Sequence, residues 1–313
     1  MKHNTFEEDV DFGLSAPFKH LSSKYFYDDI GSGLFQEIMK MPEYYPTGCE
    51  FEILSLQGEE IINKLNFKQP FNIVEFGAGD GIKTRQLLKR LVESKIDFTY
   101  VPIDISEKAI QELEANMLSA LPHLNIKPMI GNYFKTIDEL SVLETPSLFL
   151  FLGGNIGNYQ EFEADNLLKQ FGEHMKQDDK LLIGFDLQKH PALIRDAYYD
   201  KAGITKAFNL NLLRRINREL GGNFELGQFD FYSHYDPANG DVKSYLVSLV
   251  PQRIHLPGID KCYSFEKNEL IWTELSKKYT LKGIEELGKR NNFKLVEHFL
   301  DCKHYFTDSL WCK

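Results

Sequence analysis

A cluster of glycines and acids in the first third of the chain has the composition of a ligand-binding turn. The segment Asn72–Leu88 reads NIVEFGAGDGIKTRQLL, in which Glu75 is followed by Gly77 and two further glycines. Such glycines let the backbone bend sharply and let a ligand approach the main chain. Glu75 and Asp80 flank the glycines, and acids are poorly suited to a pyrophosphate. They suit a ligand with a positive centre and no phosphate, such as S-adenosylmethionine (SAM).

A second acid ends the next apolar run. Asp104 lies near the end of Phe98–Ile105, where an α/β nucleotide site places a carboxylate to accept hydrogen bonds from ribose hydroxyls. Each feature alone has a plainer explanation, because glycine turns are common and Asp104 could cap a helix. Together they favour SAM as the cofactor. A nicotinamide-dependent dehydrogenase is the weaker alternative, since the spacing does not match G-x-G-x-x-G.

The elements that position these residues follow the pattern of a parallel α/β sheet. Short apolar runs alternate with helical patterns through the middle of the chain. Ser106 is a predicted N-cap of the helix after the second strand. The predicted strands are Phe71–Phe76, Phe98–Ile105, Asn125–Tyr133, Ser147–Gly154 and Asp179–Leu187.

The alternation stops after the fifth strand and returns near the C-terminus. A long helical segment and two strand-like segments, Phe229–Asp236 and Asp241–Pro251, occupy the interruption. The helical segment Thr280–Phe293 and two further strands then follow, which is the usual ending of a seven-stranded class I methyltransferase sheet.

The predicted fold class is therefore α/β, with a Rossmann-like, seven-stranded methyltransferase sheet. We expect residues 56–188 and 279–313 to form the SAM-binding domain. Residues 1–55 and 189–278 would form a second, substrate-binding domain, built from the N-terminus and an insertion between strands five and six.

Composition argues against several functional classes. The net charge of −10 disfavours a nucleic-acid partner, because phosphate neutralisation needs a basic face. No stretch of about 18 uncharged apolar residues exists and the N-terminus is polar, so we expect no membrane span and a cytoplasmic location. The four cysteines and nine histidines show no metal-binding spacing, so we expect no metal. No segment indicates a protein partner.

Six segments, in order along nearly the whole chain, resemble the histidine-specific Nα-methyltransferase family. Members of that family use SAM to trimethylate histidine to hercynine, the first step of ergothioneine biosynthesis. The strings GGxIGN and TExSxKY are more specific to this family than the glycine turn. The segments are EYYPT (Glu43–Thr47), EFGAGDGIKTRQLL (Glu75–Leu88), YVPIDISE (Tyr100–Glu107), LFLGGNIGNY (Leu150–Tyr159), AYYDKAGITKAFNLNLLRRINRELG (Ala197–Gly221) and IWTELSKKY (Ile271–Tyr279).

The resemblance implies roles for the cofactor residues. Gly77, Lys83 and Asp104 match cofactor-binding positions of the family. Asn132 and Tyr133 stand where the family more often has Asp and Phe, and the Asn132 oxygen can still accept from the adenine amino group. Lys83 is expected to face the methionine carboxylate of the cofactor, or else to be a solvated helix residue.

The resemblance also implies a binding site for the substrate amino acid. Asn158 and Tyr198 match residues that hold the substrate carboxylate. Tyr44 and Tyr27 match aromatic residues near the amine and are the candidate catalytic residues. Tyr44 would orient the amine for in-line attack on the methyl group, since positioning supplies most of the rate. The plainer explanation is that these tyrosines belong to the core.

Glu274 and Ser276 match the pair that reads the imidazole ring. Side chains two apart on a strand point to the same face, so both can meet one ring. Glu274 could instead form a surface ion pair with Lys277 or Lys278.

Three departures from the family pattern leave the substrate open. Ser244 stands where histidine enzymes tend to carry a Met that packs on the imidazole. Trp272 replaces a residue that is commonly His, and Gly48 replaces a larger polar residue. We therefore expect an N-methyltransferase with histidine as its first candidate substrate. The alternatives are another amino acid or amine, such as a tryptophan derivative, or a SAM-binding protein without histidine activity.

Overall fold

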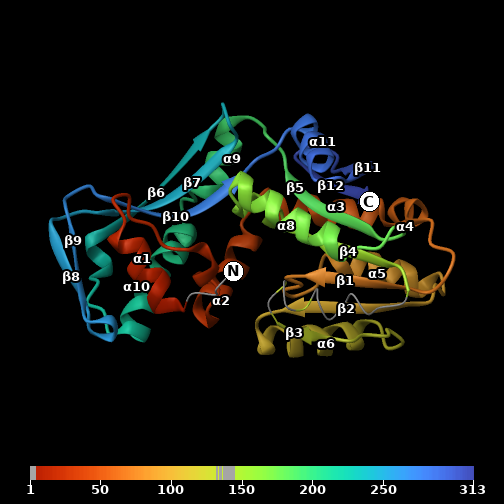
Figure 1. Cartoon of the computed structure of the whole chain (residues 1–313), viewed down its shortest axis with the longest axis horizontal. Coiled ribbons are helices and arrows are strands. Elements are labelled where there is room, and N and C mark those ends of the chain that lie inside the picture. The colour runs from red at the N-terminus through yellow and green to blue at the C-terminus, as the bar shows by residue number, and fades with distance from the viewer. Residues whose placement is uncertain (1–4, 132, 134–135, 137–144) are drawn as a thin grey trace. The chain divides into compact units, whose positions relative to one another are not determined.

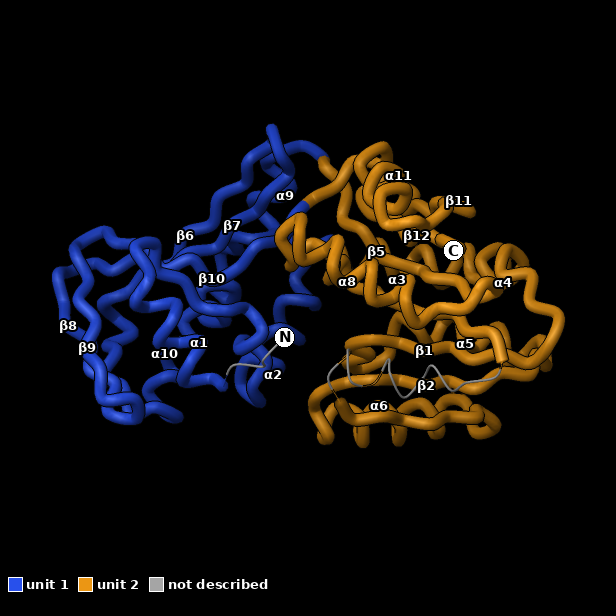
Figure 2. Tube along the Cα trace, viewed as in Figure 1, with its two compact units in different colours: residues 1–45, 189–277 blue, residues 46–188, 278–313 orange. Residues whose placement is uncertain are grey.

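The computed structural model describes residues 5–131, 133, 136 and 145–313 of the chain. It divides into two units, coloured separately in Figure 2. Unit 1 comprises the chain up to Tyr45 and Lys189–Lys277, and unit 2 comprises Pro46–Gln188 and Lys278–Lys313. The described residues contain no helix that is long and apolar enough to cross a membrane.

The first boundary between the units precedes the predicted one at residue 55. Helix α3 (Tyr45–Leu56) belongs to unit 2 from its second residue onward. Ile53 and Leu54 are fully buried, and the carbonyl oxygen of Ser55 accepts a hydrogen bond from Arg90 of the same unit. This apolar helix is therefore part of the unit that holds the large sheet.

The core of unit 2 is a seven-stranded sheet with the order β11-β12-β5-β4-β1-β2-β3 (Figure 1). Strands β1 to β5 are parallel, while β12 pairs antiparallel with both β5 and β11. The predicted seven-stranded α/β fold is confirmed. The strands are β1 (Phe71–Phe76), β2 (Phe98–Asp104), β3 (Met129–Ile130), β4 (Ser147–Phe151), β5 (Lys180–Asp186), β11 (Lys294–Leu300) and β12 (Phe306–Cys312).

Strand β3 is much shorter than the predicted segment Asn125–Tyr133. Pro128 interrupts the ladder because it has no N–H group to donate. On one side of it Lys127 donates to the Tyr100 carbonyl at 2.8 Å, and on the other only β3 continues the pairing. Asn132 lies outside the described residues.

Apolar strands and amphipathic helices build the core of unit 2. All residues of β1 and β4 are buried, as expected for central parallel strands. Ser106 is confirmed as an N-cap, since its hydroxyl accepts from the amide of Ala109 at 3.2 Å. The other helices of this unit are α4 (Gly58–Leu65), α5 (Thr84–Glu93), α6 (Glu107–Ala120), the 3-10 helix η2 (Asn155–Asn158), α8 (Glu161–His174) and α11 (Leu281–Arg290).

Unit 1 packs helices against a three-stranded antiparallel sheet of order β10-β7-β6. A separate hairpin of β8 and β9 was not predicted, because its inward-facing positions are only Ile254, Leu256, Tyr263 and Phe265. The strands are β6 (Phe229–Asp236), β7 (Asp241–Ser248), β8 (Gln252–Leu256), β9 (Lys261–Phe265) and β10 (Leu270–Lys277). The helices are α1 (Phe6–Ser15), η1 (Ser23–Tyr25), α2 (Asp29–Lys40), α9 (Pro191–Tyr198), α10 (Ile204–Leu220), η3 (Leu226–Gln228) and η4 (Pro257–Ile259).

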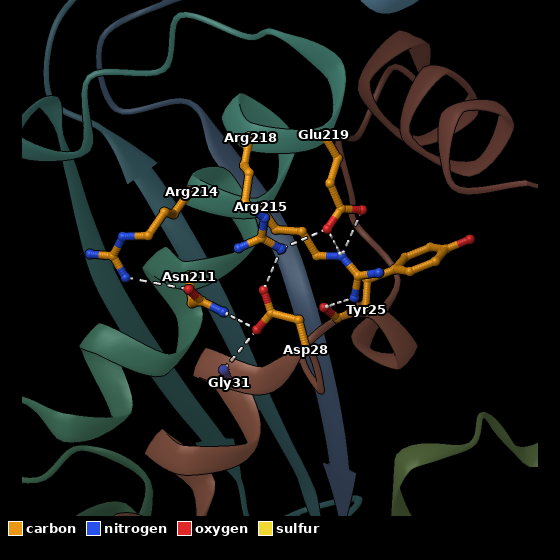
Figure 3. Close-up of polar contacts among 8 residues, drawn as sticks. All are labelled: Tyr25, Asp28, Gly31, Asn211, Arg214, Arg215, Arg218 and Glu219. Carbon is orange, nitrogen blue, oxygen red and sulfur yellow. Dashed lines mark hydrogen bonds and ion pairs between the residues drawn. The ribbon is translucent and has the colours of Figure 1, made fainter. Parts of the chain in front are cut away.

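A polar network centred on Asp28 joins the start of α2 to α10 (Figure 3). The Asp28 carboxylate accepts from the Gly31 amide at 2.7 Å, from Asn211 at 2.8 Å and from Arg218 at 2.7 Å. Burial alone would raise the pKa of Asp28, but these hydrogen bonds outweigh it and hold the pKa below its usual value. The carboxylate is therefore both a helix cap and a link to α10.

The same network fixes the chain just before α2. Arg215 of α10 donates to the carbonyl oxygen of Tyr25 at 3.0 Å and is itself paired with Glu219 (Figure 3). Tyr27 lies between this contact and Asp28 in the sequence. Its backbone is thus held against α10 from both sides.

We expect Asp28→Ala to lower the melting temperature of the protein more than Asp28→Asn does. An amide oxygen can still cap α2, whereas alanine removes the cap, which costs about 1 kcal/mol. The pair with Arg218 adds little, since that side chain is 45% exposed. Thermal unfolding at neutral pH measures both variants, and Asp29→Asn, next to the cap, is the control. Equal losses for Asn and Ala would contradict the capping role.

Candidate active site

The glycine turn after β1 contains two kinds of glycine. Gly77, Gly79 and Gly81 have φ values of +70°, +54° and +65°, which favour glycine at each position. A Cβ at Gly77 would collide with the Tyr133 hydroxyl, and one at Gly81 would collide with Met117. A Cβ at Gly79 would meet nothing within 4 Å. The open side of Gly79 is therefore where a ligand can approach the backbone.

Asp104 supports the same turn from the end of β2. Its carboxylate accepts from the Ser106 amide at 3.0 Å and lies 3.4 Å from the Gly79 amide. The residue is half-buried, so its remaining lone pairs can accept from ribose hydroxyls. Because Ser106 caps α6, helix capping does not account for Asp104.

Glu75 does not supply an anionic wall for a ligand. Its carboxylate accepts from the Thr84 hydroxyl at 2.6 Å and from the Tyr100 hydroxyl at 2.5 Å, and the residue is only 4% exposed. Burial raises the pKa of Glu75 to about 7, although both hydrogen bonds oppose the rise. Glu75 is therefore a brace between β1, β2 and α5, while Asp80 is the exposed acid of the turn.

Lys83 is not a solvated helix residue. Its ammonium group forms an ion pair with the buried carboxylate of Glu50 on α3. Burial alone would lower the pKa of Lys83, but the charge of Glu50 outweighs it and the pKa is raised. Its Nζ lies 3.5 Å from the Cβ position of Gly153 in the loop after β4. Lys83 is thus held at the carboxyl ends of β1 and β4, the edge where α/β sheets bind ligands.

Tyr133 lies beside the glycine turn. Its ring packs edge-on against Phe76 and Phe151, with centroid separations of 5.7 and 6.0 Å. Its hydroxyl occupies the space that a side chain at Gly77 would need. The described cofactor candidates Gly77, Lys83, Asp104 and Tyr133 therefore all lie at one edge of the sheet in unit 2.

Asn158 ends η2, in the loop that follows β4 in unit 2. Gly153 and Gly154 have φ values of +81° and +69°, which allow the sharp turn into η2. The hydroxyl of Tyr279 lies 3.4 Å from the carbonyl oxygen of Ile156, which supports the loop from the TExSxKY motif. Among the predicted substrate residues, Asn158 belongs to unit 2, and the others belong to unit 1.

The lysines of the TExSxKY motif have acidic partners. Lys278 and Asp186 form a buried ion pair at 2.8 Å, with side chains 1% and 4% exposed. Lys277 lies 3.6 Å from Asp241. The Lys278 pair fixes the chain where β10 leads back into unit 2.

In unit 1, Tyr198 and Ser276 meet in a buried hydrogen bond. The Tyr198 hydroxyl lies 2.8 Å from the Ser276 hydroxyl, and either group can donate. The ring of Tyr44 packs edge-on against Tyr198, with centroids 6.1 Å apart. The structure thus joins a residue predicted to hold the substrate carboxylate to one predicted to read its ring.

Glu274 lies at the centre of the three-stranded sheet. It pairs directly with Ser244 of β7, which in turn pairs with Ser233 of β6. Residues directly opposite in a sheet share a face, so three short or polar side chains form one row. The register shifts between Trp272 and Glu274, and the indole N–H of Trp272 donates to the Glu274 carbonyl at 2.8 Å.

The phenol of Tyr27 lies close enough to Glu274 to sense its charge. Burial raises the pKa of Tyr27 well above its ordinary value, and the negative charge of Glu274 raises it further. Tyr44 and Tyr198 contribute in the same direction. The residue is 39% exposed, so its ring reaches an opening while its hydroxyl lies among these groups.

An aromatic cluster surrounds these groups in unit 1. Tyr27 packs edge-on against Phe35 and Phe208 at 5.5 and 5.8 Å, and Phe35 contacts Tyr44 at 6.3 Å. Phe35 and Phe208 were not predicted as site residues. Their positions on the buried faces of α2 and α10 are the only sequence signal, and that signal is shared with core residues.

The arrangement can bind a cation that also carries a carboxylate and a polar ring. Aromatic faces stabilise ammonium groups, and the buried hydroxyls can donate to a carboxylate. In the described residues no group of three or more His, Cys, Asp or Glu side chains is placed to hold a metal ion.

Comparison with known proteins gives a consistent result. A family model described as a histidine-specific, SAM-dependent methyltransferase matches residues 6–313. A histidine N-alpha-methyltransferase from Mycolicibacterium smegmatis is 30% identical over 300 residues, covering 96% of this chain and 90% of the relative. One from Mycobacterium tuberculosis is 32% identical over 282 residues, covering 90% and 87%. An L-tryptophan methyltransferase from Psilocybe serbica is 27% identical over 299 residues, covering 86% and 82%.

The two kinds of glycine lead to a testable contrast. We expect Gly79→Ala to weaken SAM binding at least about tenfold, because the methyl group would enter the open side of the turn. Its stability loss should be limited to backbone strain of about 1 kcal/mol. Gly77→Ala should lose more stability, because its Cβ also meets the Tyr133 hydroxyl. Calorimetric titration with SAM and thermal unfolding measure the two effects. Unchanged SAM affinity in Gly79→Ala would place the ligand elsewhere.

Proposed function

This chain belongs to the histidine-specific, SAM-dependent methyltransferase family, and we propose that it methylates the α-amino group of L-histidine. The enzyme is a SAM-dependent methyltransferase. The observation that carries the histidine proposal is the convergence in unit 1 of the Tyr198–Ser276 hydrogen bond with Tyr27, Tyr44 and Glu274.

The proposed substrate site divides the amino acid into three parts. Tyr198 and Asn158 would hold the carboxylate with neutral donors, which place no cation beside the amine. Glu274 and Ser276 would read the imidazole, with the carboxylate accepting a ring N–H. Tyr44 and Tyr27 would surround the amine.

SAM supplies an electrophilic methyl group on a sulfonium when it is bound. The protein must present the amine in its neutral form, with the lone pair aimed at the methyl carbon. Burial among aromatic rings disfavours the ammonium form and so assists deprotonation. Tyr44 is the proposed orienting residue, because its ring contacts that of Tyr198 at 6.1 Å.

Tyr27 would orient the amine without acting as a phenolate base. Its raised pKa keeps the hydroxyl protonated at neutral pH, so the oxygen can accept from the amine and the proton can be donated onward. Repeated methylation yields a quaternary ammonium. The aromatic cluster and the charge of Glu274 would stabilise that product.

Another amine, such as a tryptophan derivative, is the second candidate substrate. Ser244 is buried and lies directly opposite Glu274 on the same sheet face, with Ser233 beyond it. Two serines in this row leave more room than long side chains would. Incubating the protein with SAM and a panel of amino acids, with products read by mass, distinguishes the two substrates.

We expect variants of Glu274 to rank wild type, Gln and Ala in decreasing affinity for histidine. A hydrogen bond to a charged acceptor contributes about 1.5–3 kcal/mol, so Glu274→Ala should lose about ten- to a hundredfold or more. An amide oxygen still accepts, so Glu274→Gln should lose less. Steady-state kinetics at saturating SAM give the values, and SAM affinity should not change.

Glu269→Gln is the control, because Glu269 pairs with Lys19 in the same unit. Its kinetics with histidine should match wild type. Equal kinetics for all Glu274 variants would refute histidine as the substrate. A gain of Glu274→Ala on a tryptophan derivative would support the second candidate, since a buried charge without a partner is costly.

A further inference from the structure

Glu50 connects the ends of two neighbouring strands of the large sheet. It lies on α3 and its side chain has no exposure to solvent. One carboxylate oxygen pairs with Lys83, which precedes α5 after the glycine turn of β1. The other accepts from the amide of Gly153, in the loop after β4, at 2.7 Å. Because β1 and β4 are adjacent, Glu50 bridges both loops at the cofactor-binding edge.

Glycines make the space for this bridge. A Cβ at Gly184 in β5 would collide with the Glu50 carboxylate, so only glycine fits there. A Cβ at Gly153 would lie 3.5 Å from the Lys83 ammonium, and its φ of +81° favours glycine as well. The bridge therefore occupies a site formed by three elements of unit 2.

A second buried acid lies behind Glu50. Asp308 of β12 is directly opposite Gly184 and is fully buried. In the described part of the chain neither of its oxygens has a hydrogen-bond partner of ordinary geometry, yet Glu50 is close enough to affect it. Burial raises the pKa of Asp308 well above its ordinary value, and the negative charge of Glu50 raises it further. A protonated Asp308 leaves Glu50 and Lys83 as a balanced pair, which lowers the cost of burial.

We infer that Glu50 is a positioning residue of the cofactor site, which acts on bound SAM through Lys83 and the Gly153 loop. Lys83 has three N–H donors, and the bond to Glu50 leaves others for the α-carboxylate of SAM. Holding a flexible lysine in advance reduces the entropy lost on binding. This inference rests on the proposed role of Lys83 as a cofactor-binding residue. Glu50 itself need not touch the cofactor.

A double-mutant cycle on SAM affinity tests the inference. Glu50→Gln and Lys83→Gln should each raise the Kd for SAM about tenfold or more in calorimetric titrations. The double variant should be no worse than the weaker-binding single variant, because Glu50 acts through Lys83. Glu52→Gln is the matched control, since Glu52 lies on the same helix and accepts from the Cys302 amide. Its Kd should equal that of wild type.

Kinetics separate positioning from mere stabilisation. At saturating SAM, Glu50→Gln should keep the kcat and the KM for histidine of wild type within about twofold, while the KM for SAM rises. A structural defect would instead lower kcat through a smaller active fraction and leave the KM for SAM unchanged, which would overturn the inference. If Glu50→Gln fails to fold, Lys83→Gln still decides, because its amide can donate to Glu50. An unchanged Kd for SAM in Lys83→Gln would also overturn it.

Asp308→Asn tests the neutral state of the second acid. Its amide can donate to Glu50 as a protonated carboxyl does, so the Kd for SAM should stay within about twofold of wild type. A group with a raised pKa loses its contribution to stability as pH rises. The variant lacks this loss, so its melting temperature should gain on wild type between pH 5 and pH 8. Tenfold weaker SAM binding in Asp308→Asn would overturn the neutral assignment.

The outcomes for the inference and for the proposed function are distinct. Wild type that binds SAM and methylates histidine, with additive losses in the cycle, would overturn only the role of Glu50. Wild type that binds SAM and methylates another amine would overturn only the histidine substrate. Wild type that does not bind SAM would overturn both.

Discussion

The cost of burying carboxylates governs the cofactor side of this protein. Glu75 and Glu50 are almost completely removed from solvent at the carboxyl ends of the parallel strands. A buried ionised acid is tolerated only when hydrogen bonds or an opposite charge replace the lost water. Glu75 is satisfied by two hydroxyl groups, and Glu50 by Lys83 and the Gly153 amide. The glycine turn and the loop after β4 are consequently held by side chains rather than by backbone pairing alone.

Unit 1 meets a different constraint, which is the precise aim of side chains from a small sheet. The register of β10 against β7 places Glu274 opposite Ser244, and the alternation of the strand then turns Ser276 toward the same face. Tyr198 of α9 completes the arrangement by bonding to Ser276. The network around Asp28 holds the segment that carries Tyr27. Helices and sheet therefore present their polar groups together because each is fixed by contacts within the unit.

Sequence patterns predicted much of this structure, for identifiable physical reasons. Strand Phe71–Phe76 and the cap at Ser106 are strong local signals, since periodicity and capping depend on neighbours in the chain. The short β3 and the β8–β9 hairpin were not recovered, because Pro128 and a few apolar residues give weak patterns. The partner of Lys83 was also missed, since Glu50 is distant in sequence and an ion pair leaves no periodic trace. The roles of the predicted substrate residues came from the family resemblance, not from local pattern.

The hydrogen bond between Tyr198 and Ser276 has a consequence for how this family can diversify. In the proposed function one hydroxyl belongs to the grip on the substrate carboxylate and the other to the recognition of the ring. A substitution at Ser276 that suits a new ring also removes a partner of Tyr198, and buried hydroxyls without partners are unfavourable. Evolution toward a new substrate is then easier at Ser244, which has no such shared duty, than at Ser276. Divergence in substrate choice should accordingly accumulate on β7 before it reaches the end of β10.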